Sequence, residues 1–231
     1  MVAVISGATR GLGKALAFTL AEQGFDLAIS ARNESDLSHL KSELTNAFSV
    51  KVYAQVCDLS KKEEALLFAE NVLKEYNQVD VLINNIGKYN VGRLTDEECD
   101  LESMMNTNLN SAYYLTKKIA TRMCEHQKGH IFNICSVLSL GPRIDAATYT
   151  ISKHALKGFN DVLREEMREH QVKVTAIYPG SINTSSWEGI VAPREKFVQP
   201  EDICEVIKTC ITISKNANIE EIIIKPLDKK Y

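Results

Sequence analysis

The sequence predicts an α/β fold in which seven parallel strands form one doubly wound sheet with helices on both faces. The first observation is that short β-branched runs alternate with amphipathic stretches along the whole chain. The second is that several of these runs are continuously apolar, which is typical of strands buried on both sides. The third is length, because 231 residues suffice for one large domain and not for two. We therefore expect a single domain over residues 1–231.

Each element is predicted from its hydrophobic period. The strand-like runs cover residues 2–6, 26–30, 50–56, 79–84, 130–135, 172–178 and 221–225. The helical patterns between them cover residues 12–23, 34–47, 61–76, 96–126, 147–170 and 201–213. The longest stretch with neither pattern is 180–199, which contains the single Trp of the chain. A long loop in a compact α/β domain is more often functional than accidental.

Composition argues against several classes of partner. The net charge of −3 and a pI near 6.0 disfavour a nucleic-acid or anionic-membrane surface. Six Cys without a C-x-x-C pair and five isolated His indicate neither a zinc site nor a disulfide framework. The first strand begins at Val2, which leaves no room for a signal peptide, and no apolar run approaches about 18 residues. We expect a cytoplasmic protein with no membrane partner.

The stretch "SGATRGLG", residues 6–13, follows the first predicted strand and enters the first predicted helix. Gly7, Gly11 and Gly13 could provide the tight turn and the close backbone approach that a pyrophosphate needs at a helix N-terminus. Their spacing is G-x-x-x-G-x-G and not G-x-G-x-x-G, and glycines can also simply turn the chain. The loop by itself is a candidate phosphate site.

The end of the second predicted strand bears on the cofactor. It lacks the acidic residue that holds a ribose 2′-hydroxyl and carries Arg32 instead. Arg32 and Arg10 together would suit a 2′-phosphate and favour NADP(H) over NAD(H), although either alone could be solvated surface. After the third strand, Asp58 could accept from an adenine amino group or cap the helix that starts near Lys61. Both could hold in part, with Ser60 as the cap.

A possible proton donor lies in "ATYTISKHA", where Tyr149 and Lys153 are four residues apart on one helix face. A neighbouring ammonium favours the phenolate and would lower the Tyr149 pKa from its ordinary value of about 10. The pair therefore predicts an acid that works nearer neutral pH. A surface contact between the two side chains is the commoner reason for such a spacing.

Taken together, these motifs resemble those of the classical short-chain dehydrogenase/reductase family over the whole chain. The family's T-G-x-x-x-G-x-G is similar to "SGATRGLG", its N-N-A-G to "NNIG" (84–87) and its Tyr-x-x-x-Lys to "YTISK". Its P-G-x-x-x-T segment is similar to "PGSINT" (179–184). Its catalytic Ser, thirteen residues before the Tyr, matches Ser136, and its helix-borne Asn matches Asn108. The resemblance implies a Rossmann fold and accounts for the glycine spacing.

The resemblance also implies a role for each catalytic residue. Tyr149 would be the general acid in carbonyl reduction, and Ser136 would hydrogen-bond the substrate carbonyl oxygen, so both would contact substrate. Lys153 would bind the nicotinamide ribose and lower the Tyr149 pKa. Asn108 would position a water chain behind Lys153. The expected activity is NADP(H)-dependent reduction of a carbonyl to an alcohol without a metal.

The family motifs further imply a set of cofactor contacts. They are Gly7, Thr9, Arg10, Gly11, Leu12, Gly13, Arg32, Asp58, Leu59, Asn85, Gly87, Tyr149, Lys153, Pro179, Gly180, Ile182 and Thr184. Thr184 and the backbone of Ile182 would hold the nicotinamide carboxamide. Two departures from the family pattern are Ile86 in place of Ala, which would tighten packing near the adenosine half, and Cys135 in place of Ser.

The substrate is less constrained. "MNTNLNSAYYLT", "GHIFNICSV", "PGSINTSSWEG" and "IEEIIIKP" look most like bacterial sepiapterin-reductase-like members. That resemblance would place Trp187 over a planar bicyclic substrate, and the alternative is a Trp that only packs on the domain. A 3-oxoacyl-acyl-carrier-protein reductase and a broad carbonyl reductase are the other enzyme hypotheses. A non-catalytic NADP(H)-binding regulatory module is the hypothesis from another class, and it should lack part of the catalytic set.

Two further expectations concern the oligomeric state and the long loop after the sixth predicted strand. The predicted helices 96–126 and 147–170 correspond to those that the family pairs across a two-fold axis, so we expect a homodimer or homotetramer. The segment 185–199 follows the expected carboxamide site and lacks a strong period. We expect it to be a mobile lid that closes over a small-molecule carbonyl substrate.

Overall fold

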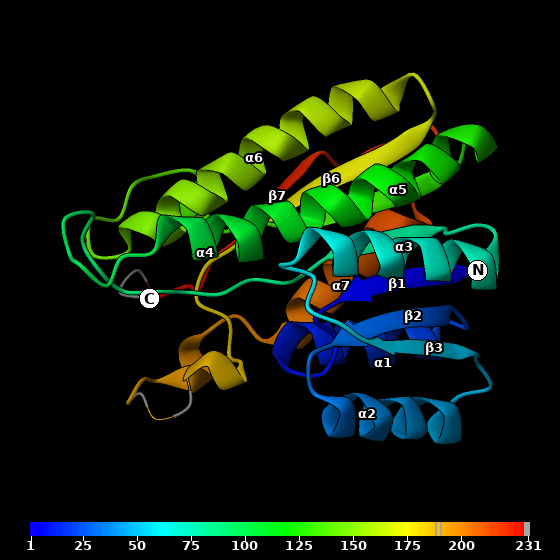
Figure 1. Cartoon of the computed structure of the whole chain (residues 1–231), viewed down its shortest axis with the longest axis horizontal. Helices are drawn as coiled ribbons and strands as arrows, with labels where there is room; N and C mark the ends of the chain where they lie inside the picture. Colours follow the sequence, from blue (N-terminus) through cyan, green and yellow to red (C-terminus); the bar gives the residue numbers. More distant parts are fainter. Residues whose placement is uncertain (188, 190, 229–231) are drawn as a thin grey trace.

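The structure is a computed structural model that describes residues 1–187, 189 and 191–228 (Figure 1). Within these residues, seven parallel strands form one sheet in the order β3-β2-β1-β4-β5-β6-β7. The strands are β1 (Val2–Ser6), β2 (Asp26–Ala31), β3 (Val52–Val56), β4 (Val81–Asn84), β5 (Gly129–Ile134), β6 (Val172–Pro179) and β7 (Glu221–Ile224). The order reverses between β1 and β4, which confirms the predicted doubly wound α/β fold.

Helices cover both faces of this sheet (Figure 1). They are α1 (Gly11–Glu22), α2 (Glu34–Ala47), α3 (Lys62–Tyr76), α4 (Leu101–Met105), α5 (Ser111–His126), α6 (Ala147–Arg168) and α7 (Pro200–Thr212). Helices α1, α2 and α7 contribute to one buried cluster, and α3, α5 and α6 contribute to the other. These six helices therefore bury their apolar stripes against the sheet.

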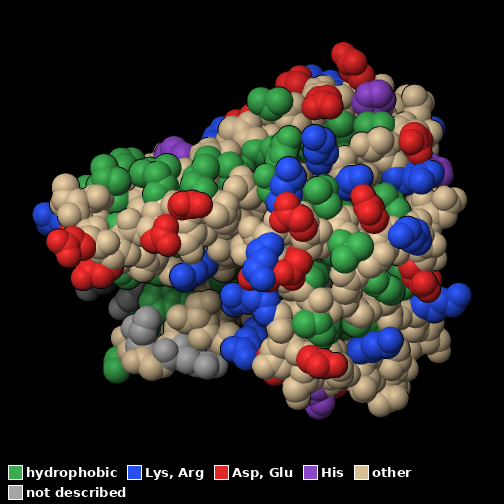
Figure 2. Space-filling model, viewed as in Figure 1, with side chains coloured by type: hydrophobic (Ala, Val, Ile, Leu, Met, Phe, Trp, Pro, Cys, Tyr) green, Lys and Arg blue, Asp and Glu red, His purple; other side chains and the backbone are tan. Residues whose placement is uncertain are grey.

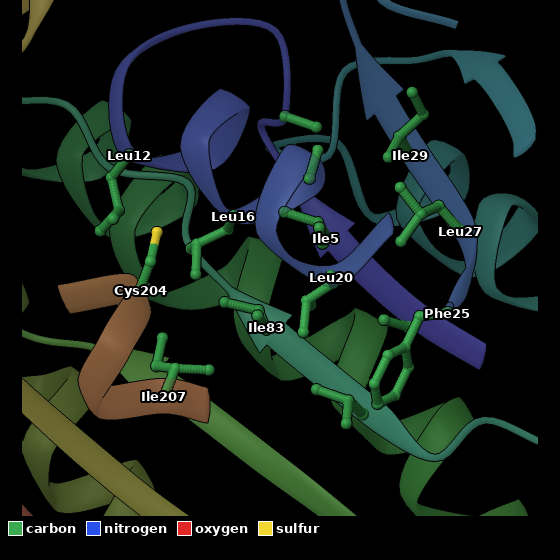
Figure 3. Close-up of a cluster of buried hydrophobic side chains, with 14 of the residues drawn as sticks. Ile5, Leu12, Leu16, Leu20, Phe25, Leu27, Ile29, Ile83, Cys204 and Ile207 are labelled. Carbon is green, nitrogen blue, oxygen red and sulfur yellow. The ribbon is translucent and has the colours of Figure 1, made fainter. Parts of the chain in front are cut away.

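The two clusters follow from the alternation of side chains along each strand. In β1, Ile5 belongs to the cluster with α1 and α7, whereas its neighbour Val4 belongs to the opposite cluster. Figure 3 shows Leu16 of α1 between Ile5 and the α7 side chains Cys204 and Ile207 of the same cluster. Both sheet faces are buried, which is why the strands are continuous apolar runs in the sequence.

The predicted helix 96–126 is wrong in two respects. It begins at Leu101, because the Asp100 carboxylate accepts a hydrogen bond from the Ser103 amide at 2.9 Å and caps the first turn. It is also interrupted by a π-helical turn over Asn106–Asn110 before α5 begins. The other predicted elements begin and end within two residues of the observed bounds.

Two properties of the described residues bear on the partners that the protein can have. Among these residues, no helix has the length and apolar character required to cross a membrane. In the same part of the chain, no cluster of three or more His, Cys, Asp or Glu side chains could hold a metal ion.

Candidate active site

The glycine loop joins β1 to α1 in a conformation that requires glycine. Gly7 and Gly11 have φ of +67° and +51°, in the left-handed region. A Cβ at Gly13 would overlap the Gly7 carbonyl oxygen and lie 2.7 Å from Nδ2 of Asn85. That amide nitrogen donates to the carbonyls of Ser6 at 3.1 Å and Gly7 at 3.0 Å. The loop is thereby held against the end of β4.

The N-terminus of α1 fits an anionic group. Within the described residues, its first turn has no capping side chain and no acidic residue, whereas α2 is capped by Asn33 and carries Glu34 and Asp36. First-turn amides without a side-chain cap, together with the helix dipole, suit a pyrophosphate. The Leu12 side chain lies in the core at 5% exposure (Figure 3), so Leu12 can reach a cofactor only through its backbone.

The two arginines predicted to contact the 2′-phosphate follow β2 and β1, and both are exposed. Arg32 is exposed at the end of β2. Arg10 is exposed as well, and its Nη2 forms an ion pair with Oδ2 of Asp36 at 2.8 Å. Thr9 is half-buried in the glycine loop, and Leu59, after β3, is in the core at 2% exposure. As with Leu12, only the backbone of Leu59 is available to a ligand.

Asp58 does not cap α3. Its carboxylate accepts from the amide and hydroxyl of Ser60 at 3.1 Å and 2.7 Å. The capping position of α3 is Lys61, and among the described residues no side chain caps it, so the predicted cap by Asp58 or Ser60 is wrong. Burial opposes ionisation of Asp58, but the Ser60 hydrogen bonds and the charge of Arg32 hold its pKa below the ordinary value. Asp58 is therefore an anionic acceptor at neutral pH.

The predicted carboxamide segment begins where β6 ends. Pro179 is the last residue of β6, and the Gly180 amide donates to the Ile224 carbonyl at 2.8 Å. Ile182 forms an isolated bridge with Val198, which closes the base of the long loop. This bridge brings the end of the predicted lid back to its start.

The predicted lid is also tied to the glycine loop. A Cβ at Gly11 would lie 3.0 Å from Cβ of Thr184, so the two segments touch. The Arg194 guanidinium donates to the Thr184 carbonyl at 3.0 Å and to Oδ1 of Asn183 at 2.8 Å. Nδ2 of Asn183 donates in turn to Oε1 of Gln199 at 2.8 Å. The sequence did not predict this set of hydrogen bonds between Arg194, Asn183, Thr184 and Gln199, because no hydrophobic period marks it.

Trp187 packs on its own loop. Its ring centroid lies 4.8 Å from that of Phe197, which is buried. This contact is what the packing alternative for Trp187 expects. Residues 188 and 190 of the predicted lid lie outside the described residues.

Ser136 follows β5, and Tyr149 lies in the first turn of α6. The Ser136 side chain faces the Tyr149 phenol closely enough to favour its ionised form. Ser136 is placed by a short turn in which its Oγ accepts from the Leu138 amide at 3.1 Å. The Ser139 hydroxyl accepts from the Ser136 amide at 3.2 Å. Ser139 was not predicted, although S-x-x-S spacing resembles a capping box.

Lys153 lies one helical turn after Tyr149, at 3% exposure. Its Nζ donates to the Ile134 carbonyl at 2.9 Å and lies 5.9 Å from the centroid of the Tyr149 ring. A Cβ at Gly87 would lie 3.3 Å from this Nζ, so glycine leaves the ammonium room. Burial lowers the pKa of Lys153 to about 8. The predicted Tyr149, Lys153 and Ser136 are thus brought together.

Burial also dominates the acidity of Tyr149. It raises the pKa of the Tyr149 phenol to about 12, and the neighbouring Ser136 side chain opposes this only in part. The predicted lowering of the Tyr149 pKa by Lys153 is therefore wrong. The physical reason is that the Lys153 ammonium is held by the Ile134 carbonyl and not by the phenol. Tyr149 is a neutral phenol at neutral pH.

Asn108 lies in the π-helical turn and links the other members of the site. Its Oδ1 accepts from the Lys88 amide at 2.7 Å, and its Nδ2 donates to the Lys88 carbonyl at 3.0 Å. Nδ2 also donates to Oγ of Ser152 at 2.8 Å, and that hydroxyl donates to the Tyr149 carbonyl at 2.7 Å. The turn aims Asn108 inward, in keeping with the frequent use of π-bulges at functional sites.

The comparison with known proteins identifies the family. Residues 1–195 match the short chain dehydrogenase family. The chain belongs to this family. An uncharacterized oxidoreductase of Staphylococcus aureus (strain MRSA252) is 30% identical over 98% of this chain and 97% of its own length. Short-chain dehydrogenases act on carbonyl and alcohol groups, so the protein is an oxidoreductase of this kind.

Two solved structures of oxidoreductases are similar to nearly the whole chain. A metagenomic short-chain oxidoreductase in complex with NADP has a TM-score of 0.86 at 32% identity, covering 99% of this chain and 98% of its own. An alcohol dehydrogenase from the archaeon Thermococcus sibiricus, complexed with 5-hydroxy-NADP, has a TM-score of 0.90 at 27% identity. That match covers 98% of this chain and 96% of the archaeal chain.

Proposed function

We propose that the protein is an NADPH-dependent reductase that converts a small-molecule ketone or aldehyde into an alcohol. The observation that supports this most is the meeting of Ser136, Tyr149 and Lys153 at the carboxyl ends of β4 and β5, where the Lys153 ammonium lies beside Gly87 and binds the Ile134 carbonyl. NADPH, when bound, supplies hydride to the carbonyl carbon.

Each catalytic residue then has a defined task. Ser136 hydrogen-bonds the carbonyl oxygen, and Tyr149, protonated at neutral pH, gives its phenolic proton to that oxygen as the alcohol forms. Lys153 holds a positive charge under the phenol and offers hydrogen bonds to the nicotinamide ribose. Asn108 fixes the chain at Lys88, and it would position the water chain that the family motif implies behind Lys153.

The cofactor would be held by the residues that the family motifs indicate. The glycine loop and the start of α1 take the pyrophosphate, and Asp58 accepts from adenine. The chain after β6 takes the carboxamide through Thr184 and the backbone of Ile182. Arg32 and Arg10 take the 2′-phosphate, and the NADP forms in the two related structures support this preference over NADH.

Cofactor preference is tested by Arg32→Ala. Because Arg10 is already paired with Asp36, Arg32 should contribute more to 2′-phosphate binding. Losing a charge-assisted contact of about 1.5–3 kcal/mol should weaken NADPH binding roughly ten- to a hundredfold, measured by fluorescence titration. NADH binding to the same variant is the internal control and should barely change. Equal losses for both cofactors would contradict the 2′-phosphate assignment.

The physiological substrate is tested by NADPH oxidation at a fixed protein concentration. Sepiapterin, diketones, acetoacetyl thioesters and quinones separate a sepiapterin-reductase-like enzyme, a general carbonyl reductase and a 3-oxoacyl-acyl-carrier-protein reductase. The alternative of a non-catalytic regulatory module predicts tight NADPH binding without oxidation by any of them. The presence of all four catalytic residues argues against this module.

The lid and Trp187 remain part of the proposal. Residues 185–199 would close over the substrate, and Trp187 would leave Phe197 to contact it. Trp187→Ala should then raise the KM for the best substrate. An unchanged KM would mean that Trp187 only packs within the loop.

We also propose a homodimer or homotetramer formed through α5 and α6. Tyr113 on α5 is 40% exposed, and on α6 Ile151 and Val162 are 39% and 69% exposed. Figure 2 shows hydrophobic side chains gathered along this part of the molecule. Such a surface is suited to burial against a second copy. Light scattering at micromolar concentration tests this, and a monomer would contradict it.

A further inference from the structure

Tyr89 borders the catalytic phenol, although no motif marks it. Its ring centroid lies 4.9 Å from that of Tyr149, and the two planes meet at 71°, an edge-to-face contact. The preceding residue, Lys88, has both its amide and its carbonyl bound by the Asn108 side chain. The backbone from which the Tyr89 ring projects is therefore fixed by the same side chain that supports the catalytic helix.

Beside Tyr149, the Tyr89 ring is placed where it could contact a bound substrate. The Ser136 side chain neighbours the phenol, and the Lys153 ammonium lies 5.9 Å from the ring centroid. Tyr89 adds an aromatic wall that is 46% exposed. Trp187, the aromatic residue expected over the substrate, instead contacts Phe197. Tyr89 thus combines contact with the proton donor and an exposed aromatic surface.

We propose that Tyr89 is a specificity-determining residue that binds a planar, aromatic substituent next to the substrate carbonyl. This inference rests on the proposed reductase function. A carbonyl oxygen that receives the Tyr149 proton lies at the phenol. The group attached to the carbonyl carbon therefore lies close in space to the Tyr89 ring, which contacts Tyr149. Aromatic rings favour offset or edge contacts at centroid distances that such a substituent can reach. Aryl ketones and aldehydes are accordingly the favoured substrate class.

The test compares acetophenone with cyclohexyl methyl ketone, which have the same carbon skeleton and differ in the planarity of the ring. Tyr89→Leu should raise the KM for acetophenone about three- to tenfold. The kcat for acetophenone and the KM for cyclohexyl methyl ketone should change less than about twofold. Tyr89→Phe retains the ring and should restore the acetophenone KM. Equal KM changes for the two ketones, or a Tyr89→Phe variant as weak as Tyr89→Leu, would overturn the proposal.

A matched control is Tyr113→Leu. Tyr113 is 40% exposed and also makes an edge-to-face contact, with Tyr114 at 5.2 Å, but it lies on α5. Its replacement should leave the ratio of the two KM values unchanged. A shift as large as that of Tyr89→Leu would mean that loss of any exposed ring produces the effect, and it would overturn the assignment.

A binding measurement separates failure of this inference from failure of the reductase proposal. Line broadening of the acetophenone ring protons in NMR reports binding without turnover. If no carbonyl compound is reduced, the proposed function fails, and the Tyr89 inference is decided by this signal. Broadening that is present in the wild type and Tyr89→Phe and lost in Tyr89→Leu supports it. Absent broadening in the wild type, or equal broadening in all three proteins, overturns it.

Discussion

At the scale of single residues, burial shifts the pKa values of Tyr149 and Lys153 in opposite directions, although the two side chains share one site. The pKa of Tyr149 is raised to about 12 and that of Lys153 is lowered to about 8. Carbonyl reduction needs a protonated phenol and a charged ammonium, and Lys153 is the first of the two to deprotonate as pH rises. We expect kcat/KM for reduction to be flat below pH 8 and to fall above it. A steady-state pH profile checks this, and an unchanged value up to pH 9.5 would contradict it.

At the scale of elements, the loop after β6 is attached to the glycine loop through Thr184, and Arg194 fixes the Thr184 carbonyl. Arg194→Ala removes two hydrogen bonds that position this segment. A net loss of about 1 kcal/mol corresponds to roughly fivefold weaker NADPH binding. Fluorescence titration measures the affinity, and limited proteolysis should show faster cleavage within 183–199.

Lys196→Ala is the matched control for that element. Lys196 lies in the same short helical turn, Arg194–Lys196, but its ion pair with Asp228 at 3.2 Å is at the surface. Surface pairs contribute little. This variant should bind NADPH as the wild type does. Equal effects of the two substitutions would contradict the claim that the Arg194 hydrogen bonds position this loop.

At the scale of the whole molecule, stability in acid depends on buried His130. Its ring stacks on Phe132 at 3.9 Å, its Nε2 lies 2.8 Å from Oγ1 of Thr175, and burial lowers its pKa to about 3. The unfolded chain, with a His pKa near 6.5, binds this proton first as pH falls. Between about pH 6.5 and 3 the free energy of unfolding should therefore drop by up to about 1.4 kcal/mol per pH unit from this residue.

Urea unfolding at pH 7, 6 and 5 measures this dependence. His130→Gln keeps a neutral hydrogen-bonding side chain near Thr175 and should reduce the slope of stability against pH, even if it lowers stability at pH 7. An identical slope in the variant and the wild type would mean that other groups control the acid limb.

The parallel sheet and its two helix layers could be predicted from the sequence. Strands buried on both faces appear as continuous apolar runs, and helices buried on one face appear as a helical hydrophobic period. The motifs then located Ser136, Tyr149 and Lys153 along the chain. The π-helical turn at Asn106–Asn110 could not be predicted, since one shifted hydrogen-bond register leaves no trace in hydrophobic periodicity. The contact of Tyr89 with Tyr149 joins residues far apart in sequence. The raised Tyr149 pKa reflects burial, which exists only in the folded chain.

The central claim is that Tyr149 is the proton donor in NADPH-dependent carbonyl reduction. Single-turnover NADPH oxidation by Tyr149→Phe, with a substrate that the wild type reduces well, tests it most directly. The substitution removes only the hydroxyl and leaves the other expected cofactor contacts in place, so fluorescence titration should show that NADPH binding remains. The rate of hydride transfer should fall by roughly 10²–10⁴, the contribution of a positioned acid. A variant that keeps more than about a tenth of the wild-type rate would contradict the mechanism.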